Sequence, residues 1–170
     1  MILIGLGANL PSEGYGAPES TLEAALGLMA ERGVSVRRCS RWYRTPPVPM
    51  SDQPWYVNGV AAVETGLSPA SLLNVLQATE KALGRARRTR WEARVADLDL
   101  LAYGTQIIGD HGRTGETALA VPHPRLHERL FVLIPLVELD RHWRHPILGK
   151  TAADLLAELP PDPRIKPFGA

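Results

Sequence analysis

Two carboxylates stand two positions apart in the segment Asp97-Leu98-Asp99-Leu100-Leu101. If this segment is a strand, Asp97 and Asp99 point to one face, and Leu98 and Leu100 point to the other. Neighbouring carboxylates repel each other, and a cation between them relieves that repulsion. A hard cation with oxygen ligands, most often magnesium, fits the pattern. A solvated strand edge with two exposed acids is the structural alternative.

An arginine-dense stretch comes just before the two acids. Its members are Arg85, Arg87, Arg88, Arg90 and Arg94. Guanidinium groups match phosphate oxygens, and the indole of Trp91, which stands among them, can stack on a base or a pterin ring. Acidic metal ligands beside such a cluster predict a magnesium–polyphosphate site. For the arginines alone, a solvated basic loop or a nucleic-acid patch remains the alternative.

Further along the chain, the segment Val121-Pro-His-Pro-Arg125 places His123 between two prolines. A histidine there can protonate against a phosphate, and a loop histidine exposed to water is the alternative. His127 follows in the same segment, but the prolines argue against a helical zinc pair. The segment Gly149-Lys-Thr151 resembles the end of a phosphate-binding loop. That motif fails, because Arg144 occupies the position of its first glycine.

The elements that must position these residues follow from periodicity and from helix and turn signals. Strands are predicted at residues 1–7, 34–45, 56–64 and 95–103. Helices are predicted from the capping residues Ser20 and Thr21 to about Arg32, and from Ser68, with Pro69 in its first turn, to Gly84. The order is that of an α+β, ferredoxin-like βαββαβ sandwich. Two extra C-terminal helices, near 128–139 and 152–159, and a tail at 160–170 complete one domain spanning residues 1–170.

The composition excludes several classes of protein. The formal net charge is +1, which gives no global field for nucleic acid or membrane. No apolar run is long enough for a membrane helix, and no leader pattern opens the chain, so we expect a cytoplasmic protein. The one cysteine, Cys39, cannot form an intramolecular disulfide, and we expect it to be structural.

Taken together, these segments resemble the 6-hydroxymethyl-7,8-dihydropterin pyrophosphokinase family of folate biosynthesis. The resemblance runs from Ile2 to about Leu156. Its segments are Gly7-Ala-Asn-Leu10, Trp42-Tyr-Arg-Thr-Pro-Pro47, Gln53-Pro-Trp-Tyr-Val-Asn58, Leu76-Gln-Ala-Thr-Glu80, Leu83-Gly-Arg-Ala-Arg87, Trp91-Glu-Ala-Arg-Val-Ala-Asp-Leu-Asp-Leu-Leu101 and Val121-Pro-His-Pro-Arg125, followed by Arg129 and Phe131. Each segment alone is weak, whereas the ordered set is specific.

The resemblance implies a role for each matching position. Asp97 and Asp99 would bind two magnesium ions that bridge the phosphates of ATP, the co-substrate, and Arg85, Arg94, Asp97 and Asp99 would form the catalytic set. The implied ATP-binding residues are Gln77, Glu80, Arg85, Arg87, Trp91, Arg94, Leu100, His123 and Arg129. The implied pterin-binding residues are Thr45, Pro46, Val48, Tyr56, Asn58, Trp91 and Phe131.

The implied reaction is attack of the pterin hydroxymethyl oxygen on the β-phosphorus of ATP, with AMP leaving. Asp97 is the candidate base, and long loops around residues 46–53 and 85–94 would close the site. The resemblance further implies a monomer that binds only small molecules. The chain departs from the family pattern at Ala93, where proline is usual, and in a longer segment at residues 109–117 that carries Asp110, His111 and Arg113.

Two other functions compete with this prediction. A two-metal nucleotidyltransferase or phosphodiesterase would also use the acids and arginines, but it leaves Tyr56, Asn58 and Phe131 unexplained. A non-enzymatic ferredoxin-like RNA-binding module would present aromatic residues on its sheet. Aromatic residues make up only 6% of the chain, which disfavours that module.

Overall fold

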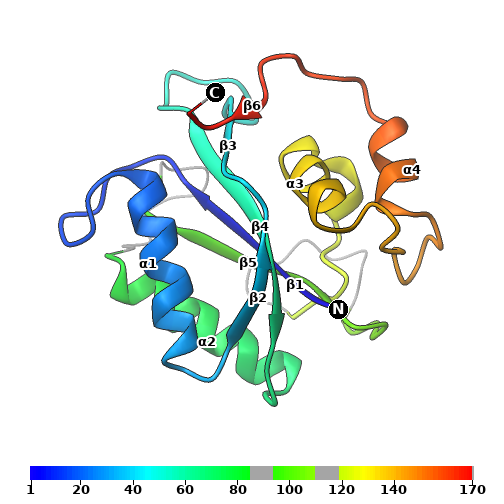
Figure 1. Cartoon of the computed structure of the whole chain (residues 1–170), viewed down its shortest axis with the longest axis horizontal. Helices are drawn as coiled ribbons and strands as arrows, with labels where there is room; N and C mark the ends of the chain where they lie inside the picture. The colour runs from blue at the N-terminus through cyan, green and yellow to red at the C-terminus, as the bar shows by residue number, and fades with distance from the viewer. Residues whose placement is uncertain (85–93, 110–118, 170) are drawn as a thin grey trace.

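The computed structural model describes residues 1–84, 94–109 and 119–169. Its elements are β1 (Ile2–Ala8), α1 (Pro18–Ala30), β2 (Ser35–Cys39), β3 (Tyr43–Thr45), β4 (Tyr56–Glu64), α2 (Pro69–Ala82), β5 (Asp97–Tyr103), a 3-10 helix (Leu126–Glu128), α3 (Leu130–Asp140), α4 (Ala152–Ala157) and β6 (Lys166–Pro167) (Figure 1). No helix in the described residues is long and apolar enough to cross a membrane.

The strands form one sheet in the order β5-β1-β4-β3-β6, with β2 also paired to β4. All of these pairings are antiparallel. The predicted α+β sandwich with its βαββαβ order is confirmed. The predicted strand at 34–45 is wrong in one respect, because it is two strands, β2 and β3. The tail is also more ordered than predicted, because β6 pairs with β3 along Tyr43–Pro167 and Arg44–Lys166.

The break between β2 and β3 has a local cause in Ser40. Its backbone N–H donates to the carbonyl of Val60, and its hydroxyl accepts from the Val60 N–H at 3.0 Å. The Ser40 hydroxyl thus accepts a hydrogen bond that a backbone carbonyl of the neighbouring strand would otherwise accept. Beside it, the ring of Trp42 lies where a side chain on Gly59 would be, since a Cβ there would come within 2.6 Å of the ring. Only glycine permits this close packing.

Helices cover both faces of the sheet, α1 and α2 on one side and α3 and α4 on the other (Figure 1). On the first face, Leu22 and Leu76 pack in one core cluster with Leu98 and Leu100. On the second face, α3 contributes its apolar residues, including Leu133, to a separate cluster. The extra C-terminal helices therefore complete the hydrophobic core of the sheet's second face.

The start of α2 matches the prediction, and the start of α1 does not. Ser68 caps α2 by accepting from the Ser71 N–H, with Pro69 in the first turn. The first helix begins earlier than Ser20, at Pro18. Its Thr21 is buried inside the helix and donates its hydroxyl to the Ala17 carbonyl at 3.1 Å. That hydroxyl is therefore satisfied within the helix and does not cap it.

An irregularity in β5 fixes the orientation of the site. The register with β1 shifts, so that Ile4 faces Leu100 while Leu3 faces Ala102. Leu101 is the extra residue, and its side chain joins the cluster under α3. Before this bulge the alternation is regular, with Leu98 and Leu100 in the cluster under α1 and α2. Asp97 and Asp99 therefore lie on the opposite face, which is the α3 side of the sheet.

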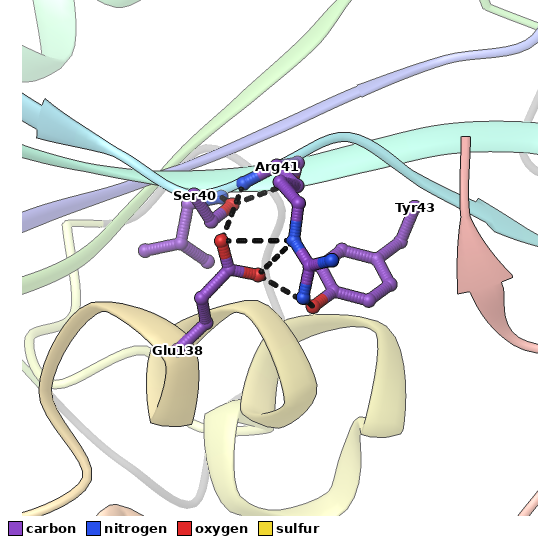
Figure 2. A network of polar contacts seen from close by, with 5 residues as sticks. Ser40, Arg41, Tyr43 and Glu138 are labelled. Carbon is purple, nitrogen blue, oxygen red and sulfur yellow. Dashed lines mark hydrogen bonds and ion pairs between the residues drawn. The ribbon is translucent and has the colours of Figure 1, made fainter. Parts of the chain in front are cut away.

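A polar network joins α3 to the connection between β2 and β3 (Figure 2). The carboxylate of Glu138 accepts hydrogen bonds from the hydroxyl of Tyr43 and from the backbone N–H and Nε of Arg41. Burial alone would raise the pKa of Glu138, but the hydrogen bonds from Tyr43 and Arg41 together outweigh it and hold the pKa below its usual value. Burial and the Glu138 charge raise the pKa of the half-buried Cys39 thiol to about 11.

We expect Glu138→Ala to lower the free energy of unfolding by about 1–3 kcal/mol, because it removes a charged acceptor from several donors. The Glu138 side chain is 28% exposed, so water replaces part of what is lost. Urea denaturation measures the change. Glu23→Ala, on the exposed side of α1, is the matched control. Equal midpoints for the two variants would show that the network does not stabilise the fold.

Candidate active site

A cavity of about 730 Å³ is lined from both faces of the sheet, with Asp97 and Asp99 on the α3 side and Gln77 and Glu80 of α2 on the other. Every site residue predicted from the sequence lines this cavity, provided that the structure describes it. They are Thr45, Pro46, Val48, Tyr56, Asn58, Gln77, Glu80, Arg94, Asp97, Asp99, Leu100, His123, Arg129 and Phe131. The other predicted site residues, Arg85, Arg87 and Trp91, lie outside the described residues, as do Ala93, Asp110, His111 and Arg113.

Each aspartate is paired with an arginine. The Arg94 Nη1 lies 2.6 Å from Asp97 Oδ1, and the Arg129 Nη1 lies 3.4 Å from Asp99 Oδ2. Burial lowers the pKa of Arg129, and the charge of Asp99 offsets this in part. For Arg94, burial also works against the charge, but Asp97 outweighs it and keeps the pKa above its usual value. The site thus holds two guanidinium groups against two carboxylates in partly buried surroundings.

Asn9 holds Arg94 in position, a function that was not predicted from the sequence. Its Oδ1 accepts from the Arg94 N–H at 2.7 Å, and its own N–H donates to the Arg94 carbonyl. Its Nδ2 donates to the Pro54 carbonyl at 3.0 Å, which ties in the segment before β4. Asn9 is only 3% exposed. The signal in the sequence that could have pointed to Asn9 is its place in the Gly7-Ala-Asn-Leu10 segment, one of those that carry the family resemblance.

Glu80 of α2 supports the strand that carries the acids. Its Oε1 accepts from the Leu98 N–H at 2.7 Å, and the residue is 4% exposed. Leu98 lies between Asp97 and Asp99, so this bond fixes the backbone between the two carboxylates. Leu100 lines the same cavity while its side chain packs in the core beneath α1 and α2.

His123 is half-buried, so the alternative of a histidine exposed to water is wrong. Its N–H donates to the Leu101 carbonyl at 2.8 Å, and its Nδ1 accepts from the Arg125 N–H at 3.0 Å. Burial, together with the charges of Arg129 and Arg125, lowers the pKa of His123 to about 4. At neutral pH the ring is therefore uncharged, with its proton on Nε2.

This pKa predicts a pH dependence of stability. The folded state resists protonation down to about pH 4, whereas the unfolded state binds the proton near pH 6.5. Stability from this group is complete above pH 6.5 and is lost as the pH falls toward 4. Between pH 7 and 4.5, the free energy of unfolding of the wild type should fall by about 2 kcal/mol more than that of His123→Gln. Parallel pH profiles in urea denaturation would contradict this.

Another part of the cavity combines aromatic and hydrogen-bonding groups. The Nδ2 of Asn58, on β4, donates to the Thr45 hydroxyl at 2.7 Å. Gly7 of β1 pairs with Asn58, and a Cβ on Gly7 would come within 2.6 Å of the Asn58 Oδ1. Tyr56 begins β4, and Phe131 lies in the first turn of α3. The Arg129 guanidinium lies over the Phe131 ring, 5.5 Å from its centre, and so links the aromatic and charged parts.

The donor set suits a magnesium ion bound with its substrate. Among the residues that the structure describes, no group of three or more histidine, cysteine or acidic side chains could hold a metal. The carboxylates of Asp97 and Asp99 share one face of β5 and line the cavity. Mg²⁺ is commonly held by one or two carboxylates together with waters and substrate phosphates. The residues present fit such an ion, although they do not form a complete cage.

Comparisons with known proteins show the family to which the chain belongs. A family model described as 7,8-dihydro-6-hydroxymethylpterin-pyrophosphokinase (HPPK) matches residues 3–141. The 2-amino-4-hydroxy-6-hydroxymethyldihydropteridine pyrophosphokinase of Synechocystis is 36% identical over 162 residues, which cover 92% of this chain and 75% of that protein. The protein of the same name from Methylorubrum extorquens is 39% identical over 160 residues, with 93% and 92% covered.

Solved structures show the same fold. The wild-type Plasmodium falciparum HPPK-DHPS with pteroate superposes with a TM-score of 0.71 at 14% identity. The match covers 92% of this chain and 43% of the other, so this chain spans less than half of that protein. At this identity, the likeness supports the fold alone.

The fold and cavity, with the family match, define a small pterin pyrophosphokinase, an ATP-dependent transferase. The chain belongs to the 7,8-dihydro-6-hydroxymethylpterin-pyrophosphokinase (HPPK) family, whose members are enzymes of folate biosynthesis.

Proposed function

We propose that this protein transfers pyrophosphate from ATP to the hydroxymethyl group of 6-hydroxymethyl-7,8-dihydropterin and releases AMP. One observation carries the proposal. A single cavity gathers two arginine-paired carboxylates, and Asn58, Tyr56 and Phe131 line it too. A polyphosphate needs the first set, and a flat heterocycle with a hydrogen-bonding edge suits the second. A nucleotidyltransferase would not need the second set.

In this proposal the nucleotide is bound by the arginines together with polar and apolar residues of the same cavity. They are Gln77, Glu80, Arg94, Leu100, His123 and Arg129, together with Arg85, Arg87 and Trp91 from the sequence. The guanidinium groups neutralise charge that builds on the phosphoryl oxygens during transfer. Because His123 is neutral in the free protein, its Nε2–H can donate to a phosphate oxygen without a buried positive charge. Glu80 acts by holding the backbone of Leu98.

The pterin is bound by the second set of residues. Tyr56 and Phe131 supply aromatic surface, and the Asn58 amide forms hydrogen bonds with the polar edge of the pterin ring. Thr45 orients that amide through its hydroxyl. Pro46 and Val48, with Trp91 from the sequence, complete the enclosure. Orientation of the hydroxymethyl group toward the nucleotide supplies much of the rate enhancement.

Asp97 and Asp99 would hold two Mg²⁺ ions, which would supply charge neutralisation on the phosphates. The residues of the chain do the rest. Arg94 and Arg129 place positive charge at the same face of β5, and Asn9 fixes the backbone of Arg94. Attack is in line on the β-phosphorus, with Asp97 as the candidate acceptor of the hydroxyl proton. The proposal also takes the protein to be cytoplasmic, as the sequence predicts, and a monomer, as the family resemblance implies.

Product analysis tests the reaction. Purified protein is incubated with ATP, Mg²⁺ and 6-hydroxymethyl-7,8-dihydropterin, and the nucleotides are separated by chromatography. We expect AMP to form in proportion to pterin pyrophosphate, and not to form without pterin or with EDTA. Release of pyrophosphate with AMP retained on the pterin would instead indicate a nucleotidyltransferase. Equal AMP with and without pterin would overturn the proposal.

A further inference from the structure

The C-terminal tail, residues 160–169, lies against the cavity. Asp162 and Ile165 line it, although the family model matches only as far as residue 141. The tail reaches this position because β6 pairs with β3, and because the Phe168 N–H donates to the Trp42 carbonyl at 2.7 Å. Figure 1 shows β6 beside β3, at the end of the sheet where the loop after β3 begins. We call residues 160–169 the C-terminal strap.

A compact turn gives the strap a defined shape. Asp162 accepts from the backbone N–H of Arg164 and pairs with its guanidinium at 2.8 and 2.7 Å. The Ile165 N–H closes the turn on the Asp162 carbonyl. These bonds satisfy the Asp162 carboxylate, whose side chain is 19% exposed, and neutralise a negative charge that would repel a polyphosphate. Ile165 then offers apolar surface to the cavity.

The strap also touches the loop that follows β3. The Arg164 Nη1 lies 3.5 Å from the Met50 sulfur. Met50 is 61% exposed, so the loop has little packing of its own at this point. Val48, Pro49 and Ser51 of this loop line the same cavity as the strap. The loop thus has the strap as a neighbour, and β3, from which the loop leaves, is itself paired with β6.

We propose that the C-terminal strap is part of the pterin-binding site, an inference that rests on the function proposed above. Ile165 forms apolar wall at the pterin end of the cavity, and the Asp162–Arg164 turn positions the loop that carries Val48. The strap therefore sets affinity for the pterin. It leaves affinity for ATP unchanged, because we place the nucleotide where the cavity is lined from α2 and β5, by Gln77, Glu80 and Leu98, and not where it is lined by the strap.

Steady-state kinetics with Ile165→Ser and Arg164→Ala test the strap. We expect the KM for the pterin to rise about tenfold and the KM for ATP to stay within twofold. Lys166→Ser is the matched control, since this exposed neighbour lies in β6 and is not among the cavity-lining residues. In a variant ending at Leu159, direct binding measurements should show the same difference. Affinity for the pterin, measured on protein saturated with a non-hydrolysable ATP analogue, should fall about tenfold, and affinity for the analogue should stay within twofold.

Three results would decide against the strap. Pterin affinity within twofold of wild type, both in Ile165→Ser and in the shortened chain, would overturn its role. Parallel loss of pterin and ATP affinity would show a general structural effect and would overturn it too. If the wild type forms no pterin-dependent AMP, the proposed function fails, and the strap proposal falls with it. If the wild type forms pterin-dependent AMP and the variants keep wild-type affinity for the pterin, the strap proposal is overturned and the proposed function stands.

Discussion

Asp97→Asn should reduce kcat/KM for pterin-dependent AMP formation by at least about a thousandfold. Removing one group aimed at transition-state charge typically costs about 10²–10³ in rate. Here the change removes a proposed metal ligand and also leaves the partly buried Arg94 without the carboxylate 2.6 Å away. The asparagine keeps the size of the side chain, so the strand and cavity should remain. Initial rates measured by chromatography of AMP give the effect.

The control is Glu23→Gln, which neutralises an exposed carboxylate on α1, outside the cavity. It should keep the wild-type rate. Thermal unfolding of Asp97→Asn within a few degrees of wild type would show that the loss is chemical. A rate within tenfold of wild type at saturating Mg²⁺ would remove Asp97 from the catalytic set and would leave the arginines as the main source of charge stabilisation.

Gly7→Ala should raise the KM for the pterin by about a hundredfold while changing the KM for ATP little. The added Cβ would stand 2.6 Å from the Asn58 Oδ1, closer than real contacts allow. Asn58 is buried and held by Thr45, so the amide must leave its position or the strands must separate. Loss of directed hydrogen bonds to the ring edge costs about 2–3 kcal/mol, which corresponds to that factor.

A matched control exists in α1. Gly27→Ala adds the same methyl group where nothing lies within 4 Å, and it should leave both KM values unchanged. The double variant Gly7→Ala/Asn58→Ala separates the cause. If the clash with Asn58 is responsible, the double variant should bind pterin no worse than Asn58→Ala alone, because the effects are not additive. Additive losses would mean that Gly7 acts through the sheet and not through Asn58.

The central part of the fold and site could be predicted from local signals. The alternation from Asp97 to Leu100 fixed the face of the carboxylates, and it holds because the bulge lies beyond it, at Leu101. Ser68 and Pro69 fixed the start of α2. The gathering of Tyr56, Phe131 and Asp97 around one cavity followed from the resemblance, since no local pattern relates segments so distant along the chain.

What escaped prediction depends on partners far apart along the chain. Ser40 interrupts a strand only because Val60 lies opposite, and β6 exists only because β3 offers an edge. The low pKa of His123 comes from burial and from arginines that the tertiary structure brings close. The function of Asn9 likewise needs Arg94 beside it. The local sequence carries the propensities of each of these segments. It does not show which distant segment packs beside it, and that neighbour decides the structure that forms.

The half-buried thiol of Cys39, with its raised pKa, makes this chain suitable for site-specific labelling. With a pKa of about 11, only about three thiols in ten thousand are ionised at pH 7.5, and the thiolate is the form that alkylating dyes attack. The native protein should therefore give almost no background with a maleimide. A cysteine introduced at the exposed Lys166 would then carry the probe alone, and its fluorescence could report on the surroundings of β6 while substrates bind, without first removing Cys39.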